Sequence, residues 1–239
     1  MQMSTSIDYF FQRRDRFPFP DFFTDVHETW EILLKAKSFL KEFLVEPGIK
    51  ENHGICKGEA PALYNEYYIG EGTVIYNDVT IIGPAYIGKN CELMPGAIIR
   101  PYTILSDNCS VGHGSEVKHC VFFGGAKISS LAFAGDSILG ASARIGSGVI
   151  TANRRFDQGE VKLRDEGERK SLGDSFFGVV LGDSARIGAN SVTQPGTHIG
   201  PYSWIYPLTN VRGFIDAEQH VYHPREIVKE PAARLELKP

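Results

Sequence analysis

Two basic residues give the first suggestion of a binding site. Arg100 and Lys118 are eighteen residues apart, and each directly follows an aliphatic residue, Ile99 or Val117. If the chain stacks on itself at that interval, the two side chains project from the same face about 5 Å apart. Two like charges at that separation repel each other unless an anion lies between them. The pair therefore predicts a phosphate site, with Glu116 as an alternative, purely structural partner.

A histidine and a serine form a second candidate pair. Counted through the shortened corners described below, His113 and Ser130 both lie two residues after a core position on adjacent coils. A Ser–His pair within hydrogen-bond reach can act as a nucleophile, but it also needs an orienting group and an oxyanion site, and the sequence indicates neither. His113 and His119 fall on different faces, and the other histidines form no ligand set, so we expect no metal site.

These placements depend on a repeat of six residues. An amphipathic helix needs apolar residues every three or four positions, and a half-buried strand needs them at every second position. A period of six is typical of hexapeptide repeats that coil into a parallel β-helix with three short strands and three corners per turn. The sequence therefore predicts a mainly β protein, a left-handed parallel β-helix. The core positions of its regular part are Ile69, Ile75, Ile81, Ile87, Leu93, Ile99, Leu105, Val111 and Val117.

The six-residue repeat is interrupted in three places, and such irregularities in a β-helix often mark functional sites. The spacing shortens to five between Val117 and Phe122, and again between Ala134 and Leu139. Residues 157–177 leave the repeat in a charged, glycine-dotted excursion, which we interpret either as a solvated loop or as an arm over a site shared with a neighbouring subunit. The period then returns from Leu181 to Val211.

The flanking segments complete the predicted organisation. Residues 1–50 form an aromatic N-terminal segment and a helix over about 24–44, whose apolar face we expect to pack on the β-helix, with docking of a partner as the alternative. Residues 51–215 form the β-helix, and residues 216–239 form a C-terminal tail.

Composition limits the function classes. The 239-residue chain has 23% charged residues and a formal net charge of −4, which predicts a soluble globular protein. This mildly acidic balance does not favour binding to nucleic acid. Neither a signal peptide nor a membrane-spanning stretch is evident, and the four scattered cysteines favour the reducing cytoplasm. Cys91 and Cys109 are eighteen residues apart, so they stack on neighbouring coils and could form a bridge only under oxidation.

Several stretches together resemble a known family. They resemble the C-terminal half of sugar-1-phosphate nucleotidyltransferases, above all the bifunctional UDP-N-acetylglucosamine pyrophosphorylase/glucosamine-1-phosphate N-acetyltransferase and its short relatives. The helix around Trp30 is similar to the connector between the two domains of that family. The similarity covers roughly residues 25–215, and its most specific parts are residues 126–137, 145–153, 155–157, 182–183, 195–196 and 203–207.

The resemblance implies a homotrimer with sites in the clefts between subunits. Arg100 and Lys118 match the family's sugar-phosphate-binding pair, and Asn153 matches an asparagine near the amino sugar and the acetyl group. We assign Phe133 and Arg144 to the same substrate site.

The resemblance also implies a cofactor. The excursion at 157–177 matches a segment that reaches the acetyl-coenzyme A cleft, and we assign Arg169 and Lys170 of this arm to that cofactor.

The chain departs from the family pattern at three points. No Gly-x-Gly-Thr-Arg loop is present, so we do not expect uridylyl transfer from this chain. Ser130 stands where the family has its catalytic histidine, and Phe133 replaces an aromatic hydroxyl. A serine cannot accept a proton from an ammonium group near neutral pH as an imidazole can, so His113 is the candidate replacement base.

Three hypotheses for function follow. The chain is an acetyl- or acyltransferase acting on a sugar phosphate or nucleotide sugar, favoured by Arg100, Lys118 and Asn153. Alternatively it is a catalytically inactive sugar-phosphate-binding or scaffolding trimer, favoured by Ser130 and Phe133. A third hypothesis is a subunit that docks a separate nucleotidyltransferase through exposed N-terminal aromatic residues.

Overall fold

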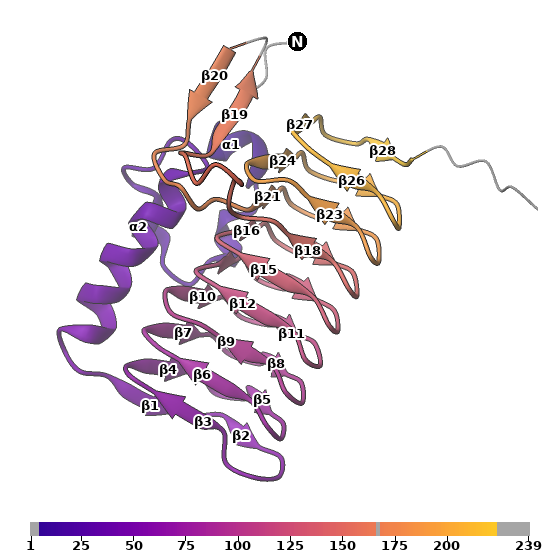
Figure 1. The fold of residues 1–239 in the computed structure, drawn as a ribbon. Coiled ribbons are helices and arrows are strands. Elements are labelled where there is room, and N and C mark those ends of the chain that lie inside the picture. Colours follow the sequence, from indigo (N-terminus) through magenta and orange to yellow (C-terminus); the bar gives the residue numbers. More distant parts are fainter. Residues whose placement is uncertain (1–4, 166–167, 224–239) are drawn as a thin grey trace, which may run out of the picture.

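The chain winds into a left-handed parallel β-helix whose coils stack along one axis (Figure 1). The computed structural model describes residues 5–165 and 168–223. Each turn contributes one strand to each of three sheets, and all neighbouring strands within these sheets run parallel. The fold predicted from the six-residue repeat is therefore confirmed.

The three sheets are named here in the order in which the chain first enters them. Sheet 1 contains β1 (Lys50–Asn52), β4 (Tyr67–Ile69), β7 (Ala85–Ile87), β10 (Thr103–Leu105), β13 (Val121–Phe122), β16 (Ile138–Leu139), β21 (Val179–Leu181), β24 (Thr197–Ile199) and β27 (Phe214–Ile215). Sheet 2 contains β2 (Ile55–Cys56), β5 (Val74–Ile75), β8 (Glu92–Leu93), β11 (Ser110–Val111), β14 (Lys127–Ile128), β17 (Arg144–Ile145), β22 (Arg186–Ile187), β25 (Trp204–Ile205) and β28 (His220–Val221). Sheet 3 contains β3 (Ala62–Tyr64), β6 (Thr80–Ile82), β9 (Ile98–Ile99), β12 (Glu116–Lys118), β15 (Phe133–Gly135), β18 (Ile150–Thr151), β23 (Val192–Thr193) and β26 (Asn210–Val211).

The core positions of the repeat point into the axis of the helix. Ile69, Ile81 and Ile99 are fully buried, and vertical register pairs Ile81 with Ile99 and Ile99 with Val117. Apolar side chains from successive coils therefore stack in rows, and burial of these rows is the main stabilising term. The same register places Arg100 and Lys118 on successive coils, as the spacing predicts.

Glycine follows a core residue at points where neighbouring coils approach each other closely. A Cβ atom built on Gly70 would lie 2.7 Å from the backbone carbon of Gly88 on the next coil, and Gly88 is equally crowded by Asp107 and Ser106. No side chain fits there without moving backbone, so the repeated Ile-Gly step is a packing requirement.

The N-terminal segment covers the outer face of sheet 1. It contains α1 (Ile7–Phe10), η1 (Arg14–Arg16) and η2 (Pro20–Phe23), and its aromatic rings pack inward. Phe10 and Phe11 are fully buried, and the ring of Phe11 stacks on that of Phe123 at 4.8 Å. The expectation that these aromatic residues are exposed for docking is therefore wrong: they are already occupied within the chain.

The predicted N-terminal helix is shorter than expected. Helix α2 spans Glu31–Leu40 and continues as a π-helical turn, η3 (Lys41–Val45). It begins at Glu31 because the preceding residues pair with the N-terminus in an antiparallel bridge, and the Glu31 carboxylate accepts hydrogen bonds from the amides of His27 and Glu28. Ile32, Leu33, Ala36 and Leu40 are buried with the sheet 1 face, whereas Leu34 is 47% exposed, so the packing interpretation of this helix is confirmed.

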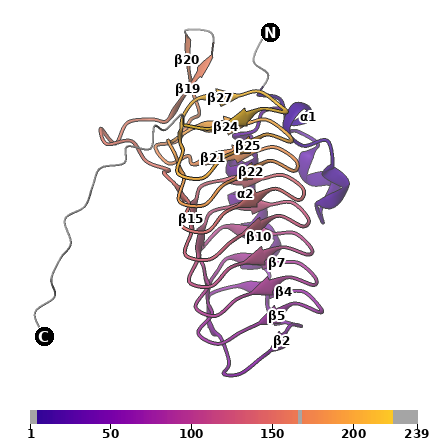
Figure 2. The same cartoon turned by 90° about the vertical axis from the view of Figure 1, so that its right-hand side faces the viewer.

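The excursion forms an arm at the corner between sheets 3 and 1. Strands β19 (Lys162–Asp165) and β20 (Glu168–Ser171) make an antiparallel hairpin beside the N-terminal segment (Figures 1 and 2). Leu163 and Leu172 are buried in the same cluster as the N-terminal aromatic residues. The arm therefore packs within its own chain at its base.

Both ends of the coil stack differ slightly from the predicted boundaries. Strand β1 begins at Lys50, and β28 continues the coils to Val221, beyond the expected limit at 215. Residues 224–239 of the expected tail lie outside the described residues. Cys91 and Cys109 are free and buried, and among the described residues no helix is both long and apolar enough to cross a bilayer.

Candidate functional site

Arg100 and Lys118 line one small cavity at the corner between sheets 3 and 1. The cavity has a volume of about 270 Å³, and Asp174 and Phe176 from the distal end of the arm also line it. Helix α2 contributes Lys37, whose ammonium lies 3.6 Å from the Asp174 carboxylate. Three parts of the chain that are distant in sequence therefore meet at the predicted phosphate site.

A buried carboxylate organises this corner. Asp136, only 2% exposed, accepts hydrogen bonds from Lys118 Nζ at 3.0 Å, His119 Nδ1 at 2.8 Å and Asn153 Nδ2 at 2.5 Å. The ammonium of Lys118 also lies 4.4 Å from the ring centroid of Phe176. Lys118 is therefore held in one position from two sides.

His119 links this network to helix α2. Its Nδ1 lies 2.8 Å from the Asp136 carboxylate, and its Nε2 lies 3.0 Å from the Leu33 carbonyl of α2. Burial raises the pKa of Asp136, but the hydrogen bonds from His119 and Lys118 outweigh it and hold that pKa below its usual value.

The two basic residues are already paired within the chain. Arg100 Nη1 lies 2.7 Å from Glu116 Oε1, so the structural partner considered from the sequence is present. Lys118 has Asp136 as its own partner. Because a guanidinium carries five donors and an ammonium three, each cation keeps further donors for a ligand.

The predicted substrate residues do not all converge. Asn153 joins Lys118 through Asp136, so these two residues belong to one network. Phe133 lies on the outer face of sheet 3, in register with Glu116 and Ile150. Arg144 lies on sheet 2, where it lines a different hollow with Arg186 and Trp204.

His113 and Ser130 occupy the corner between sheets 2 and 3. The two residues are on adjacent coils, because the Leu131 amide donates to the His113 carbonyl at 2.8 Å. The imidazole of His113 does not contact Ser130; its Nδ1 lies 2.7 Å from the Pro95 carbonyl on the opposite neighbouring coil. That contact fixes the proton on Nδ1 and leaves Nε2 as an acceptor.

Of the two arm residues assigned to a cofactor, the structure describes the side chain of Lys170 only. The side chain of Arg169 lies outside the described part of the structure. The Lys170 ammonium lies 3.2 Å from the Glu28 carboxylate and 4.5 Å from the ring centroid of Trp30, so it ties the arm to the N-terminal segment.

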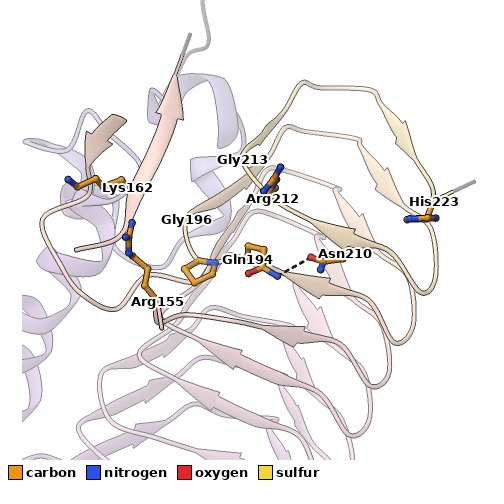
Figure 3. Close-up of a pocket in the computed structure, with 9 residues that line it drawn as sticks. Arg155, Lys162, Gln194, Gly196, Asn210, Arg212, Gly213 and His223 are labelled. Carbon is orange, nitrogen blue, oxygen red and sulfur yellow. Dashed lines mark hydrogen bonds between the residues drawn. The ribbon is translucent and has the colours of Figure 1, made fainter. Parts of the chain in front are cut away.

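Another cleft opens between the base of the arm and the last coils (Figure 3). It has a volume of about 820 Å³, and its polar rim includes Arg155, Gln194, Asn210 and Arg212. Arg155 is neutralised by Asp157, and the Gln194 amide donates to Asn210 at 3.0 Å. Sequence reasoning did not single out this cleft.

Three residues of the Arg100–Lys118 cavity were also missed as site residues. Asp136 directly follows Gly135, the register partner of Lys118, so stacking counted through the shortened corner could have found it. Asp174 and Phe176 had no such signal, because they lie at the C-terminal end of the arm, outside the repeat.

The fold and site define a protein of the hexapeptide-repeat, left-handed β-helix class. Residues 81–167 match the family model described as the GMPPB C-terminal domain. The chain is related to bifunctional enzymes that combine sugar-1-phosphate nucleotidylyltransferase and acetyltransferase activities. The family resemblance stated in the sequence analysis is therefore confirmed.

Two relatives illustrate the match. The bifunctional sugar-1-phosphate nucleotidylyltransferase/acetyltransferase of Sulfurisphaera tokodaii is 35% identical over 113 residues, which are 47% of this chain and 28% of that protein. The bifunctional protein GlmU of Methanocaldococcus jannaschii is 33% identical over 208 residues, which are 87% of this chain and 49% of that protein. The chain thus spans about half the length of this relative.

Among solved structures, the Francisella novicida UDP-N-acetylglucosamine acyltransferase is similar at a TM-score of 0.41 and 16% identity. The similarity covers 68% of this chain and 60% of that one.

Proposed function

We propose that this chain binds a sugar 1-phosphate or nucleotide sugar in the Arg100–Lys118 cavity and transfers an acetyl group to it from acetyl-coenzyme A. The observation that supports this proposal most directly is the placement of Lys118, held by Asp136 beside Arg100. Three cations (Lys37, Arg100 and Lys118) face three carboxylates (Glu116, Asp136 and Asp174). A phosphate would therefore meet a site whose charges are balanced and whose cations keep spare donors.

His113 is the proposed general base. Its Nδ1 is engaged by the Pro95 carbonyl, so the lone pair on Nε2 is directed outward and can accept the proton that an ammonium acceptor loses on acylation. Ser130, one coil away, has no group that could take that proton.

The proposed base and the proposed phosphate site lie at opposite edges of sheet 3. Five residues separate His113 from Lys118, which corresponds to about 16 Å of extended strand. A sugar phosphate is too small to bridge that distance within one chain. A site between two copies, in a homotrimer, brings the His113 edge of one subunit against the Arg100–Lys118 edge of another.

Complementation between subunits tests this arrangement. The variants His113→Ala and Arg100→Ala/Lys118→Ala are each expected to lose acetyl transfer to glucosamine 1-phosphate, by about 100-fold or more for the base. Co-expressed with different tags and purified as mixed oligomers, they should regain up to about a quarter of wild-type activity, because random mixing in a symmetric oligomer restores that share of the interfaces. Thiol release from acetyl-coenzyme A is the measurement.

The controls separate the possible failures. Each variant alone must keep the wild-type oligomeric state and thermal midpoint. Equal rates for wild type and His113→Ala would show that His113 is not the base. Absent complementation between two correctly assembled variants would contradict a site shared between subunits.

A second candidate function rests on Ser130 and Phe133, which replace the histidine and the aromatic hydroxyl of the family. On this reading the trimer binds a sugar phosphate without turnover. Calorimetric titration that detects glucosamine 1-phosphate, but neither coenzyme A binding nor thiol release, would favour this reading. A location in the cytoplasm remains a prediction.

A further inference from the structure

A lysine from outside the β-helix reaches the Arg100–Lys118 cavity. Lys37 lies on helix α2, and its side chain lines the cavity together with those of Arg100 and Lys118. Those two cations pair with Glu116 and Asp136, which belong to sheet 3 and its corner with sheet 1. Lys37 pairs instead with a carboxylate of the arm, Asp174. The helix and the arm, both outside the repeat, thus add one opposite charge each to the same cavity.

The ion pair between Lys37 and Asp174 is looser than the pair between Lys118 and Asp136. Its Nζ–Oδ2 distance is 3.6 Å, against 3.0 Å for Lys118 and Asp136. The Lys37 side chain is 42% exposed, whereas Asp136 is almost completely buried. A partly exposed ion pair of this length contributes little to stability, because water screens both charges. Exchange of partners by Lys37 therefore has a low cost.

Of the two members of this pair, Asp174 is held more firmly. Its Oδ1 accepts the Phe176 amide at 3.0 Å, and its main-chain carbonyl accepts the Val161 amide at 2.9 Å. The ring of Phe176 in turn lies against the Lys118 ammonium. The ammonium of Lys37 ends a flexible four-carbon stem. When an anion enters the cavity, Lys37 is thus the member of the pair that is able to move.

We propose that Lys37 is a phosphate-binding residue of this cavity and that Asp174 competes with the phosphate for it. In the free protein the Lys37 ammonium stays with the carboxylate of Asp174. When a phosphate occupies the cavity beside Arg100 and Lys118, the ammonium of Lys37 turns to the phosphoryl oxygens. Asp174 is therefore an internal competitor that weakens phosphate binding. This inference rests on the proposed function, because it places the phosphate in the Arg100–Lys118 cavity.

The charges of the cavity give this competition its size. Lys37, Arg100 and Lys118 are matched by three carboxylates, so an entering phosphate meets no net attraction. Removal of the Asp174 charge leaves the cavity with one net positive charge and frees the donors of Lys37. At a separation of a few ångströms, one such charge changes the affinity for an anion about tenfold or more.

A purely structural latch is the alternative interpretation of the same contact. On that interpretation the pair holds the arm against α2 and so keeps the ring of Phe176 over Lys118. Loss of the Asp174 charge would then loosen the arm and weaken the binding of a phosphate. The two interpretations predict opposite signs for one substitution.

Calorimetric titration of the whole chain with glucosamine 1-phosphate, and separately with inorganic phosphate, measures this sign. Asp174→Asn removes the charge but keeps the Oδ1 acceptor for the Phe176 amide. We expect it to tighten the binding of both ligands about tenfold or more. Asp157→Asn is the matched control, because it removes a carboxylate of the same arm that does not line the cavity, and it should leave the affinity unchanged.

Substitution of Lys37 tests the other half of the proposal. Lys37→Gln should weaken phosphate binding about fivefold or more, as expected for loss of a charge-assisted contact. Lys41→Gln is its control, since Lys41 is exposed on the next turn and does not line the cavity. The double variant Lys37→Gln/Asp174→Asn separates competition from simple repulsion. If Asp174 acts by holding Lys37, its substitution should increase the affinity at least about threefold less when Lys37 is absent.

The outcomes keep this inference separate from the proposed function. Unchanged or weaker binding in Asp174→Asn overturns the inference, as does an equal gain with and without Lys37. If Asp174→Asn fails to fold, Asp174→Ser gives the same comparison, because serine also supplies an acceptor. Tighter binding without thiol release from acetyl-coenzyme A would support the inference and contradict acetyl transfer. Failure of wild type and all variants to bind either ligand would overturn both.

Discussion

Asp136 illustrates how much of the site depends on single residues. It connects the amide of Asn153, the ammonium of Lys118 and the ring of His119, and through His119 it reaches the Leu33 carbonyl of α2. Counting through the shortened corner can place Asp136 next to Gly135, the register partner of Lys118 on the next coil. The link to α2 could not be predicted, because no periodicity relates a helix before the repeat to a corner within it.

His198 is a second buried polar residue, and its burial predicts an effect on the pH dependence of stability. Its ring is fully buried, stacks on Phe177 at 5.9 Å, donates from Nδ1 to the Gly196 carbonyl and accepts at Nε2 from the Thr29 hydroxyl. Burial lowers the pKa of His198 to about 4, against the opposing effects of the Gly196 carbonyl and Glu28.

The lowered pKa of His198 predicts a pH-dependent stability. Between about pH 6.5 and pH 4 the unfolded chain binds a proton at this site that the folded chain does not, so the free energy of unfolding falls as pH falls through this window. The expected loss is about 3 kcal/mol. Chemical denaturation at several pH values should show a flatter profile for His198→Gln than for wild type. Parallel profiles for the two proteins would contradict the assignment.

At the scale of elements, the N-terminal segment behaves as part of the core of the molecule. Its aromatic content indicates packing, but nothing in the sequence identifies sheet 1 as the face that it covers. The structure shows the reason: sheet 1 presents outward-facing apolar residues, Tyr86, Ile104, Val121 and Ile138, that require a cover. The start of α2 could not be predicted either, because the bridge between Ser6 and Glu28 sets it.

A truncation within this segment tests its role. Phe11→Ala removes a fully buried ring that stacks on Phe123, so we expect a loss of about 3–5 kcal/mol in the free energy of unfolding. The matched control is Phe156→Ala, since the Phe156 side chain is fully exposed and its truncation should change stability by less than about 0.5 kcal/mol. Similar denaturation midpoints for the two variants would mean that the segment adds no stability.

At the scale of the whole molecule, the three sheets have different outer faces. Sheet 1 is covered by the N-terminal segment, and the outer face of sheet 2 carries Lys127, Arg144, Arg186 and Trp204 in one column. Sheet 3 leaves Ile98 37% and Ile150 41% exposed, next to Leu131 at 66% on its corner. The sequence predicts these positions as outward-facing, and the register places them in one strip, interrupted by Glu116, beside both halves of the proposed active site.

This strip is the expected contact between subunits. Ile150→Asp should convert a trimer into monomers in sedimentation experiments while leaving the circular dichroism spectrum unchanged, because a charge in an apolar interface is costly to bury. Ile55→Asp is the matched control: Ile55 is 53% exposed on sheet 2, and its replacement should leave the assembly intact. A wild-type chain that sediments as a monomer would remove the basis for a shared site.

The first coil of the stack has a further consequence. Strands β1, β2 and β3 are each hydrogen-bonded to a neighbour on one side only, so their other edges offer free backbone groups to any extended chain. Edges of this kind can template end-to-end growth into fibres. Here each edge strand has two or three residues, and β1 consists of the exposed polar residues Lys50, Glu51 and Asn52. At this end the stack of near-identical coils is thus protected from polymerising by the shortness of all three edge strands and by the charges of β1.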